Sequence, residues 1–196
     1  MPADTEPAAQ DVDQLLAALG PLPPPRRRPT LVVVSGLPGT GKSLFCRELR
    51  RRTGVVILES DALRKLLFPR PTYSGEESQR LFAAVHAAIE RLLAAGVSCA
   101  LDATNLKERH REPLYAIAEE QGARLVLVEV TAAPEVVRRR LARRLREGDA
   151  PSDADVAVYE RMRREVEEIP REHHVVDTGA DMGPALAAIG REIEAP

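Results

Sequence analysis

The stretch SGLPGTGKS, residues 35–43, decides the fold of this chain. It fits the phosphate-binding P-loop pattern G-x-x-x-x-G-K-[ST], whose fixed positions fall at Gly36, Gly41, Lys42 and Ser43. The apolar residues 31–34 read as a buried strand entering the loop, and residues 44–49 read as a helix leaving it. Pattern and flanks together predict a nucleoside triphosphate site, and the competing interpretation is a chance glycine-rich turn.

Each part of the loop has a physical role in holding phosphate. Glycines let successive backbone N–H groups turn towards phosphate oxygens, and the helix N-terminus adds the positive end of its dipole. Lys42 would reach the β- and γ-phosphates of ATP, and the Ser43 hydroxyl would hold Mg²⁺. The predicted nucleotide-binding residues are Gly36, Pro38, Gly39, Thr40, Gly41, Lys42, Ser43 and Leu44.

The composition fits one α/β domain with an aliphatic core. The chain has 196 residues, of which 44% are apolar and only 3% aromatic. A net charge of −2 argues against a protein that coats nucleic acid through charge alone. Cys46 and Cys99 lack the spacing of a disulfide framework or a zinc site, so we expect buried thiols. With no signal-peptide pattern and no membrane-span window, we expect a cytoplasmic protein.

Residues 1–30 are expected to form an N-terminal extension and linker ahead of a P-loop domain over residues 31–196. Within the extension, residues 11–19 can form a short amphipathic helix, with Asp11 as its cap and Gly20 as its stop. Residues 21–29 are rich in Pro and Arg and read as a stiff linker.

From residue 31 onward, strand and helix patterns alternate, which is typical of a parallel sheet wrapped by helices. The predicted strands cover residues 31–35, 55–59, 97–102, 124–131 and 173–177. The predicted helices cover residues 42–52, 61–68, 75–95, 107–121, 134–147, 153–168 and 181–194. This α/β fold has a five-stranded parallel sheet, and its ligand is expected at the carboxyl ends of the strands.

Polar residues follow two of these strands. Asp61 and Arg64 share a face if their segment is helical, so a carboxylate there could accept a hydroxyl proton while Arg64 holds an anionic acceptor group. The alternative is that Ser60 or Asp61 only caps the helix. Asp102 closes an apolar strand at the Walker B position, where it can orient Mg²⁺ or its water.

The segment after Asp102 offers further anion ligands. Thr104 and Asn105 either bond phosphate oxygens or cap the following helix. Arg109 and Arg111 oppose the helix dipole, which favours an anionic ligand, although solvated surface arginines are the alternative. The histidines are interpreted as structural because they lack metal-ligand spacing; they are His86, His110, His173 and His174.

An arginine-rich amphipathic helix over residues 134–146 is followed by a Gly- and Pro-containing joint and a second helix. This arrangement suits a lid over ATP at about residues 134–168, with one arginine reaching the transferring phosphoryl group. The alternative is an ordinary basic surface helix.

Taken together, these residues resemble the AAA-type P-loop kinases that include bacteriophage and bacterial polynucleotide kinases. The resemblance covers about residues 31–180 and also includes residues 152–154 before a helix that holds Tyr159. It implies that Asp61 is the general base for a 5′-hydroxyl and that Arg64 contacts the adjoining acceptor phosphate. It also implies a transition-state arginine in the lid, which could be Arg140, Arg143 or Arg144. Tyr73, Phe68 and Phe82 are the few aromatic candidates for stacking a base.

The predicted function is ATP- and Mg²⁺-dependent phosphoryl transfer to a hydroxyl, with the 5′-hydroxyl of a polynucleotide preferred as acceptor. The alternatives are a small-molecule kinase acting on a sugar, antibiotic or sugar-nucleotide hydroxyl, and a non-catalytic nucleotide-binding module. A GTPase switch is excluded because the chain lacks both Asp-x-x-Gly after the third strand and Asn-Lys-x-Asp after a later one. The site residues expected to contact the acceptor are Asp61, Arg64, Asp102, Thr104, Asn105 and Arg109.

Overall fold

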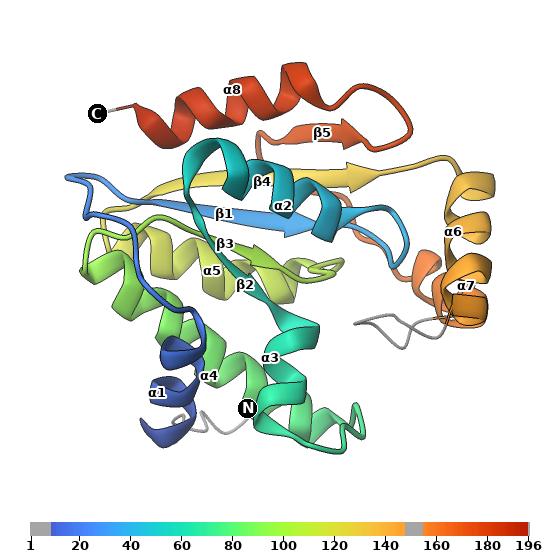
Figure 1. The fold of residues 1–196 in the computed structure, drawn as a ribbon, viewed down its shortest axis with the longest axis horizontal. Coiled ribbons are helices and arrows are strands. Elements are labelled where there is room, and N and C mark those ends of the chain that lie inside the picture. The colour runs from blue at the N-terminus through green and yellow to red at the C-terminus, as the bar shows by residue number, and fades with distance from the viewer. Residues whose placement is uncertain (1–8, 148–154, 196) are drawn as a thin grey trace.

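The computed structural model describes residues 9–147 and 155–195. The strands are β1 (Thr30–Ser35), β2 (Val56–Glu59), β3 (Cys99–Asp102), β4 (Arg124–Thr131) and β5 (His174–Asp177). The helices are α1 (Ala9–Ala18), α2 (Lys42–Thr53), α3 (Ser60–Leu67), α4 (Gly75–Ala94), α5 (Glu108–Glu120), α6 (Pro134–Glu147), α7 (Val156–Arg163) and α8 (Gly183–Glu194). The predicted alternation of strands and helices is confirmed (Figure 1).

The five strands form one parallel sheet in the order β2-β3-β1-β4-β5. Helices α2 and α8 cover one face, and α4 and α5 cover the other (Figure 1). Alternate residues of β1 serve the two layers: Leu31 and Val33 pack towards α4 and α5, whereas Val32 and Val34 pack towards α2 and α8. This is the predicted P-loop α/β fold, in which the P-loop follows the central strand.

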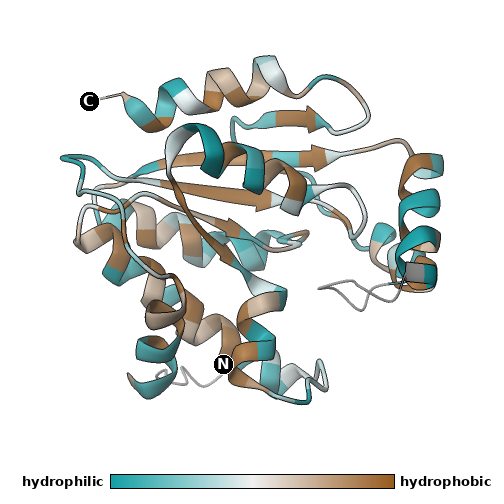
Figure 2. Cartoon of the chain, viewed as in Figure 1, coloured by the Kyte–Doolittle hydropathy of each residue, from teal (hydrophilic) through white to brown (hydrophobic). Residues whose placement is uncertain are grey.

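The core is aliphatic, as the composition predicts, and both cysteines are buried in it. Hydropathy follows the layers, with apolar strands inside and polar outer faces on the helices (Figure 2). No helix within residues 9–147 and 155–195 combines the length and the apolar character needed to cross a membrane.

Helix α1 packs against α4 and confirms the predicted N-terminal helix, with Val12 and Leu15 fully buried. The prediction that Asp11 caps this helix is wrong, because Asp11 lies inside α1. Instead, Asp11 forms a bidentate ion pair with Arg80 of α4 at 2.7 and 2.8 Å. A contact made by folding thus replaces the local cap that sequence alone suggested.

The predicted helix over residues 153–168 is shorter in the structure. Its first two residues lie outside the described part of the chain, and α7 ends at Arg163. The chain then runs back towards β3, where the Glu167 amide donates to the Leu106 carbonyl at 2.9 Å. The Glu167 amide is therefore engaged with a distant segment instead of with a carbonyl of its own helix. Tyr159 of α7 is buried against Val137 and Leu141 of α6.

Candidate functional site

The P-loop joins β1 to α2 and owes its shape to glycine. Gly36, Gly39 and Gly41 have φ angles of 152°, 81° and 100°, which side chains other than hydrogen rarely allow. Space is also restricted, because a Cβ atom on Gly36 would collide with the Val130 carbonyl, and one on Gly41 would lie 2.9 Å from Thr178 Oγ1. The glycine positions of the motif are therefore fixed both by backbone conformation and by packing.

A cavity of about 790 Å³ opens at the carboxyl edge of the sheet, beside this loop. Five of the predicted nucleotide-binding residues line it: Pro38, Gly39, Gly41, Lys42 and Ser43. Gly36 and Thr40 line a second cavity of about 180 Å³. Leu44, on the first turn of α2, lines neither cavity and is exposed. The cavity therefore meets the loop at its lysine and serine end.

The side chain of Lys42 donates a hydrogen bond to the Leu37 carbonyl at 3.1 Å, across the loop. Burial lowers the pKa of Lys42, and the negative charges of Asp102 and Asp61 oppose that effect. The Thr40 hydroxyl donates to the same carbonyl at 2.8 Å. The Lys42 ammonium thus lies close enough to both predicted carboxylates to feel their negative charge.

Two carboxylates end neighbouring strands beside the lysine. Glu59 of β2 and Asp102 of β3 are paired in the sheet register. Burial raises the pKa of Asp102, whereas Lys42 and a hydrogen bond from Ser43 lower it. Burial and the charges of Asp102 and Asp61 raise the pKa of Glu59, which also bonds Ser43. Sequence reasoning missed Glu59, although an acid that closes a short apolar strand was the available signal.

The same carboxylates provide a test of whether Mg²⁺ fits here. Asp102 Oδ2 is buried and has no hydrogen-bond partner among the residues that the structure describes. An orphaned carboxylate oxygen beside the Ser43 hydroxyl is the oxygen donor set that Mg²⁺ prefers. No cluster of three His, Cys, Asp or Glu side chains suited to a metal occurs in residues 9–147 and 155–195. A magnesium ion would therefore take most of its ligands from nucleotide phosphates and water.

Asp61 and Arg64 lie on α3 and both line the cavity, so the helical condition for their shared face is met. Arg64 is only 6% exposed and donates to Glu77 at 2.6 Å and to Ser78 at 3.2 Å, both on α4. Its guanidinium also lies over the Tyr73 ring, 4.9 Å from the centroid. Arg64 is therefore held rigidly, and Glu77 balances its charge.

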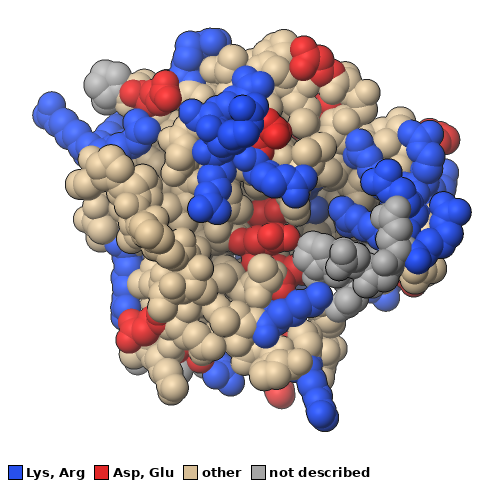
Figure 3. Space-filling model, viewed as in Figure 1, with Lys and Arg blue, Asp and Glu red and all other residues tan. Residues whose placement is uncertain are grey.

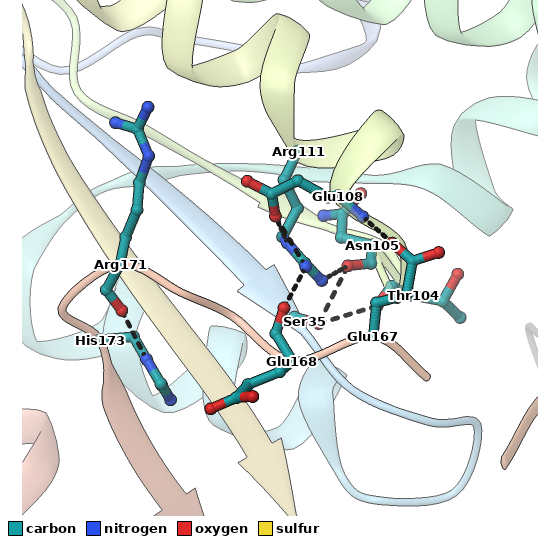
Figure 4. Close-up of polar contacts among 9 residues, drawn as sticks. All are labelled: Ser35, Thr104, Asn105, Glu108, Arg111, Glu167, Glu168, Arg171 and His173. Carbon is teal, nitrogen blue, oxygen red and sulfur yellow. Dashed lines mark hydrogen bonds and ion pairs between the residues drawn. The ribbon is translucent and has the colours of Figure 1, made fainter. Parts of the chain in front are cut away.

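The residues after β3 brace the P-loop strand (Figure 4). The Asn105 amide donates to the Val34 carbonyl at 2.8 Å, and the Thr104 carbonyl accepts the Gly36 N–H at 3.0 Å. The alternative that Thr104 or Asn105 caps the next helix is wrong, because the cap position of α5 is Lys107. Both residues line the cavity together with Arg109.

Arg111 has a structural role that sequence reasoning did not anticipate. It is only 1% exposed and donates to the Asn105 carbonyl at 2.9 Å, the Glu168 carbonyl at 2.8 Å and the Glu108 carboxylate (Figure 4). The expectation that Arg111 serves an anionic ligand or lies on the surface is wrong. The guanidinium instead ties the loop after β3 to the segment after α7.

The three candidate lid arginines lie in different places on α6. Arg144 lines the cavity, whereas Arg143 is exposed and does not. Arg140 donates to the Thr40 carbonyl at 3.1 Å, and to the hydroxyl and carbonyl of Thr178 at 2.7 and 3.1 Å. The joint predicted between the two lid helices falls mainly on residues 148–154, outside the described part of the chain.

Side chains from α4, α5 and α7 complete the cavity wall. Of the histidines interpreted as structural, His86 and His110 line the cavity, whereas His174, on the edge strand β5, contacts Glu192 of α8 at 2.6 Å. In the space-filling view, arginines gather over the end of the molecule formed by α6, and acidic side chains lie near the middle of that face (Figure 3). The lining residues that sequence did not single out include Glu59, Ser78, Gln79, His86, His110, Val158, Arg161 and Met162.

A family profile described as an AAA domain (AAA_33) matches residues 31–169, from the P-loop strand to the end of the segment after α7. The chain belongs to this family. The match includes the P-loop, Asp61, Asp102 and α6.

A curated relative is the mouse protein KTI12 homolog, which is 34% identical over 133 residues. The match covers 65% of this chain and 36% of the mouse protein, so the chain spans about a third of that relative's length. It therefore relates the chain to one part of a longer protein.

Solved structures share the fold. Kti12 from Chaetomium thermophilum, in complex with ADP-AlF3, has a TM-score of 0.67 at 24% identity, covering 83% of this chain and 96% of that one. A putative kinase from Chloroflexus aurantiacus has a TM-score of 0.66 at 21% identity, covering 85% and 99%. A gluconokinase from Sinorhizobium meliloti has a TM-score of 0.59 at 23% identity, covering 86% and 96%. The domain thus has the fold of the P-loop kinases.

Proposed function

We propose that the protein is an ATP-dependent kinase that transfers the γ-phosphoryl group to a hydroxyl. The observation that carries the proposal is the position of Asp61, which lines the same cavity as Lys42, Ser43 and Asp102. Phosphoryl transfer is mostly positioning and charge neutralisation, so it needs a nucleotide cradle, a cation and an acceptor-orienting carboxylate in one enclosed space. The residues that we propose for these three roles all line the cavity at the carboxyl edge of this sheet.

On the nucleotide side, the P-loop amides and Lys42 would hold the β- and γ-phosphates. Ser43 and Asp102 would hold Mg²⁺ directly or through water, and Glu59 would accept hydrogen bonds from its water ligands. When bound, Mg²⁺ supplies charge neutralisation at the phosphate oxygens. Arg144, the candidate lid arginine that lines the cavity, would meet charge developing on the γ-phosphoryl group.

On the acceptor side, Asp61 would accept the proton of the attacking hydroxyl and orient that oxygen. The acceptor that we favour is the 5′-hydroxyl of a polynucleotide. Arg64, Arg109 and Arg161 line the cavity and would attract the adjoining phosphates. Because Glu77 already balances Arg64, the latter two arginines would contribute more of that attraction. The segment from α6 to the residues after α7, about residues 134–168, would act as the lid.

The competing functions are a small-molecule kinase and a nucleotide-binding module without transfer. The gluconokinase likeness supports the first only at the level of the fold. The test is an acceptor panel with γ-labelled ATP and Mg²⁺, in which DNA and RNA oligonucleotides with a 5′-hydroxyl are compared with the same strands carrying a 5′-phosphate. Label on the 5′-hydroxyl strands alone supports the proposal. Label only on small hydroxylated compounds refutes the polynucleotide acceptor, and ATP binding without any transfer refutes kinase activity.

A further inference from the structure

Helix α4 presents two faces of different character. One is buried in the core and includes Leu81, Ala84, Val85 and Ala88. The adjacent stripe of Ser78, Phe82 and His86 has a spacing of four residues, so these side chains follow one another along the helix and line the cavity. The acceptor side of the cavity therefore has an aromatic wall, in a chain with very few aromatic residues.

Phe82 and His86 form this wall together. Their ring centroids are 6.2 Å apart, with planes inclined by 45°. Burial lowers the pKa of His86 to about 4, so its imidazole is neutral at pH 7. No residue that the structure describes makes a hydrogen bond to His86, so its ring nitrogens are available to a ligand. A neutral imidazole can donate from one nitrogen and accept at the other.

Other parts of the cavity lining combine apolar surface with positive charge. Val158 and Met162 of α7 add apolar contacts, and Arg109 and Arg161 add guanidinium groups. A flat heterocycle with hydrogen-bonding edges and an attached phosphate suits this lining. Its ring would face the aromatic wall, its edge would reach the neutral imidazole, and its phosphate would lie near the arginines.

We propose that Phe82 and His86 form a stacking subsite for the heterocyclic base of the acceptor's terminal nucleoside. The inference rests on the proposed function, because it uses Asp61 in the same cavity to receive that nucleoside's 5′-hydroxyl. Phe82 supplies a π-face for the ring, and His86 supplies a hydrogen bond to its edge. Since every base has a π-face, the subsite distinguishes a nucleoside end from a bare sugar end more strongly than one base from another.

The first test compares two 5′-hydroxyl oligonucleotides, one with an intact terminal nucleoside and one whose terminal nucleoside is abasic. Base stacking on an aromatic side chain is worth about 1–3 kcal/mol, so the abasic end should have a KM about 5- to 150-fold higher. F82A and F82L should raise the KM of the intact acceptor by about the same factor and leave that of the abasic acceptor unchanged. The dissociation constant for ATP should not move.

Phe68→Ala is the matched control. Phe68 lies outside the cavity lining, and the Arg80 guanidinium covers its ring at 5.3 Å from the centroid. F68A should leave the preference for the intact end unchanged, whereas H86N should reduce it. The subsite proposal is wrong if the wild type has the same KM for the intact and the abasic oligonucleotides. It is also wrong if F82L raises both KM values equally. Either result leaves the proposed function intact.

A binding measurement separates the two ideas further. The probe is an oligonucleotide with 2-aminopurine at its 5′ end, added to the ATP-analogue-bound protein, because stacking quenches its fluorescence. Quenching that is lost in F82L and kept in F68A supports the subsite even if no phosphate is transferred, in which case only the proposed reaction fails. If the oligonucleotide is neither bound nor labelled, the subsite and the polynucleotide acceptor are both wrong.

Discussion

The guanidinium of Arg140, on α6, donates a hydrogen bond to the main-chain carbonyl of Thr40, in the P-loop, at 3.1 Å. The same guanidinium contacts the Thr178 hydroxyl at 2.7 Å, and that hydroxyl also bonds the Thr40 carbonyl. Three segments distant in sequence thus meet behind the phosphate cradle. Arg140 does not line the cavity, so its geometry is that of a positioning residue rather than one that touches the transferring phosphoryl group.

Replacing Arg140 should therefore weaken ATP binding. R140A removes charge-assisted bonds to the loop, and we expect about a tenfold rise in the dissociation constant for ATP, or about 1.4 kcal/mol. The measurement is calorimetric titration with a non-hydrolysable ATP analogue. R139A is the control because Arg139 is exposed on the same helix. Unchanged affinity in R140A would show that the P-loop holds its shape without this contact.

Arg144 should behave differently from its neighbours on α6. If Arg144 meets the transferring phosphoryl group, R144A should lower kcat by about 10³-fold with little change in ATP affinity. R143A should stay within a few-fold of the wild type, since Arg143 does not line the cavity. Single-turnover transfer rates decide this. A larger loss of rate in R143A than in R144A would show that Arg143, and not Arg144, has the catalytic role.

Asp102→Asn tests the magnesium site. The substitution removes the charge of the orphaned carboxylate with little change in shape, so apparent Mg²⁺ affinity in the presence of ATP should fall by about 10- to 100-fold. The measurement is transfer rate or nucleotide binding as a function of Mg²⁺ concentration. D155N is a suitable control, because Asp155 caps α7 and does not itself line the cavity. An unchanged Mg²⁺ titration in D102N would remove Asp102 from the site.

The Glu77 carboxylate should make the stability of the fold depend on pH. Burial works to raise the pKa of its carboxyl, but hydrogen bonds from Thr72, Arg64 and the Tyr73 amide outweigh it and lower the pKa to about 2. A carboxyl with a depressed folded-state pKa stabilises the fold fully above its unfolded value of 4.5 and loses that contribution as pH falls towards about 2.

The urea midpoint of E77Q should accordingly lie below that of the wild type at pH 7, and the difference should shrink as the pH is lowered from 4.5 to 3. E76Q is the control, since Glu76 is exposed on the same first turn of α4. A difference that is independent of pH would mean that Glu77 contributes through packing rather than through its charge.

The fold was accessible from sequence because its signals are local. The P-loop lies between a strand and a helix that are adjacent to it, and the period of the apolar residues changes at each boundary. Asp102 and Glu59 follow the same logic, since each closes an apolar strand, and the parallel register alone brings them together. A reading of all strand ends would have included Glu59.

The remaining site contacts depend on packing between distant segments. Thr178 lies 138 residues from the Thr40 carbonyl that it bonds, and no local pattern marks that pair. Arg111 looks like a surface residue of an amphipathic helix, yet the turn of the chain after α7 buries it. His86 appears isolated in sequence, and only the packing of α4 beside the cavity places it in the cavity lining.

The central claim is that Asp61 serves phosphoryl transfer, and the most direct measurement compares wild type and D61N in one experiment. Single-turnover transfer from γ-labelled ATP to a 5′-hydroxyl oligonucleotide would be measured beside the dissociation constant for the ATP analogue. The account predicts that D61N transfers about 10²- to 10⁴-fold more slowly while binding the nucleotide as the wild type does. Equal transfer rates in the two proteins would contradict it.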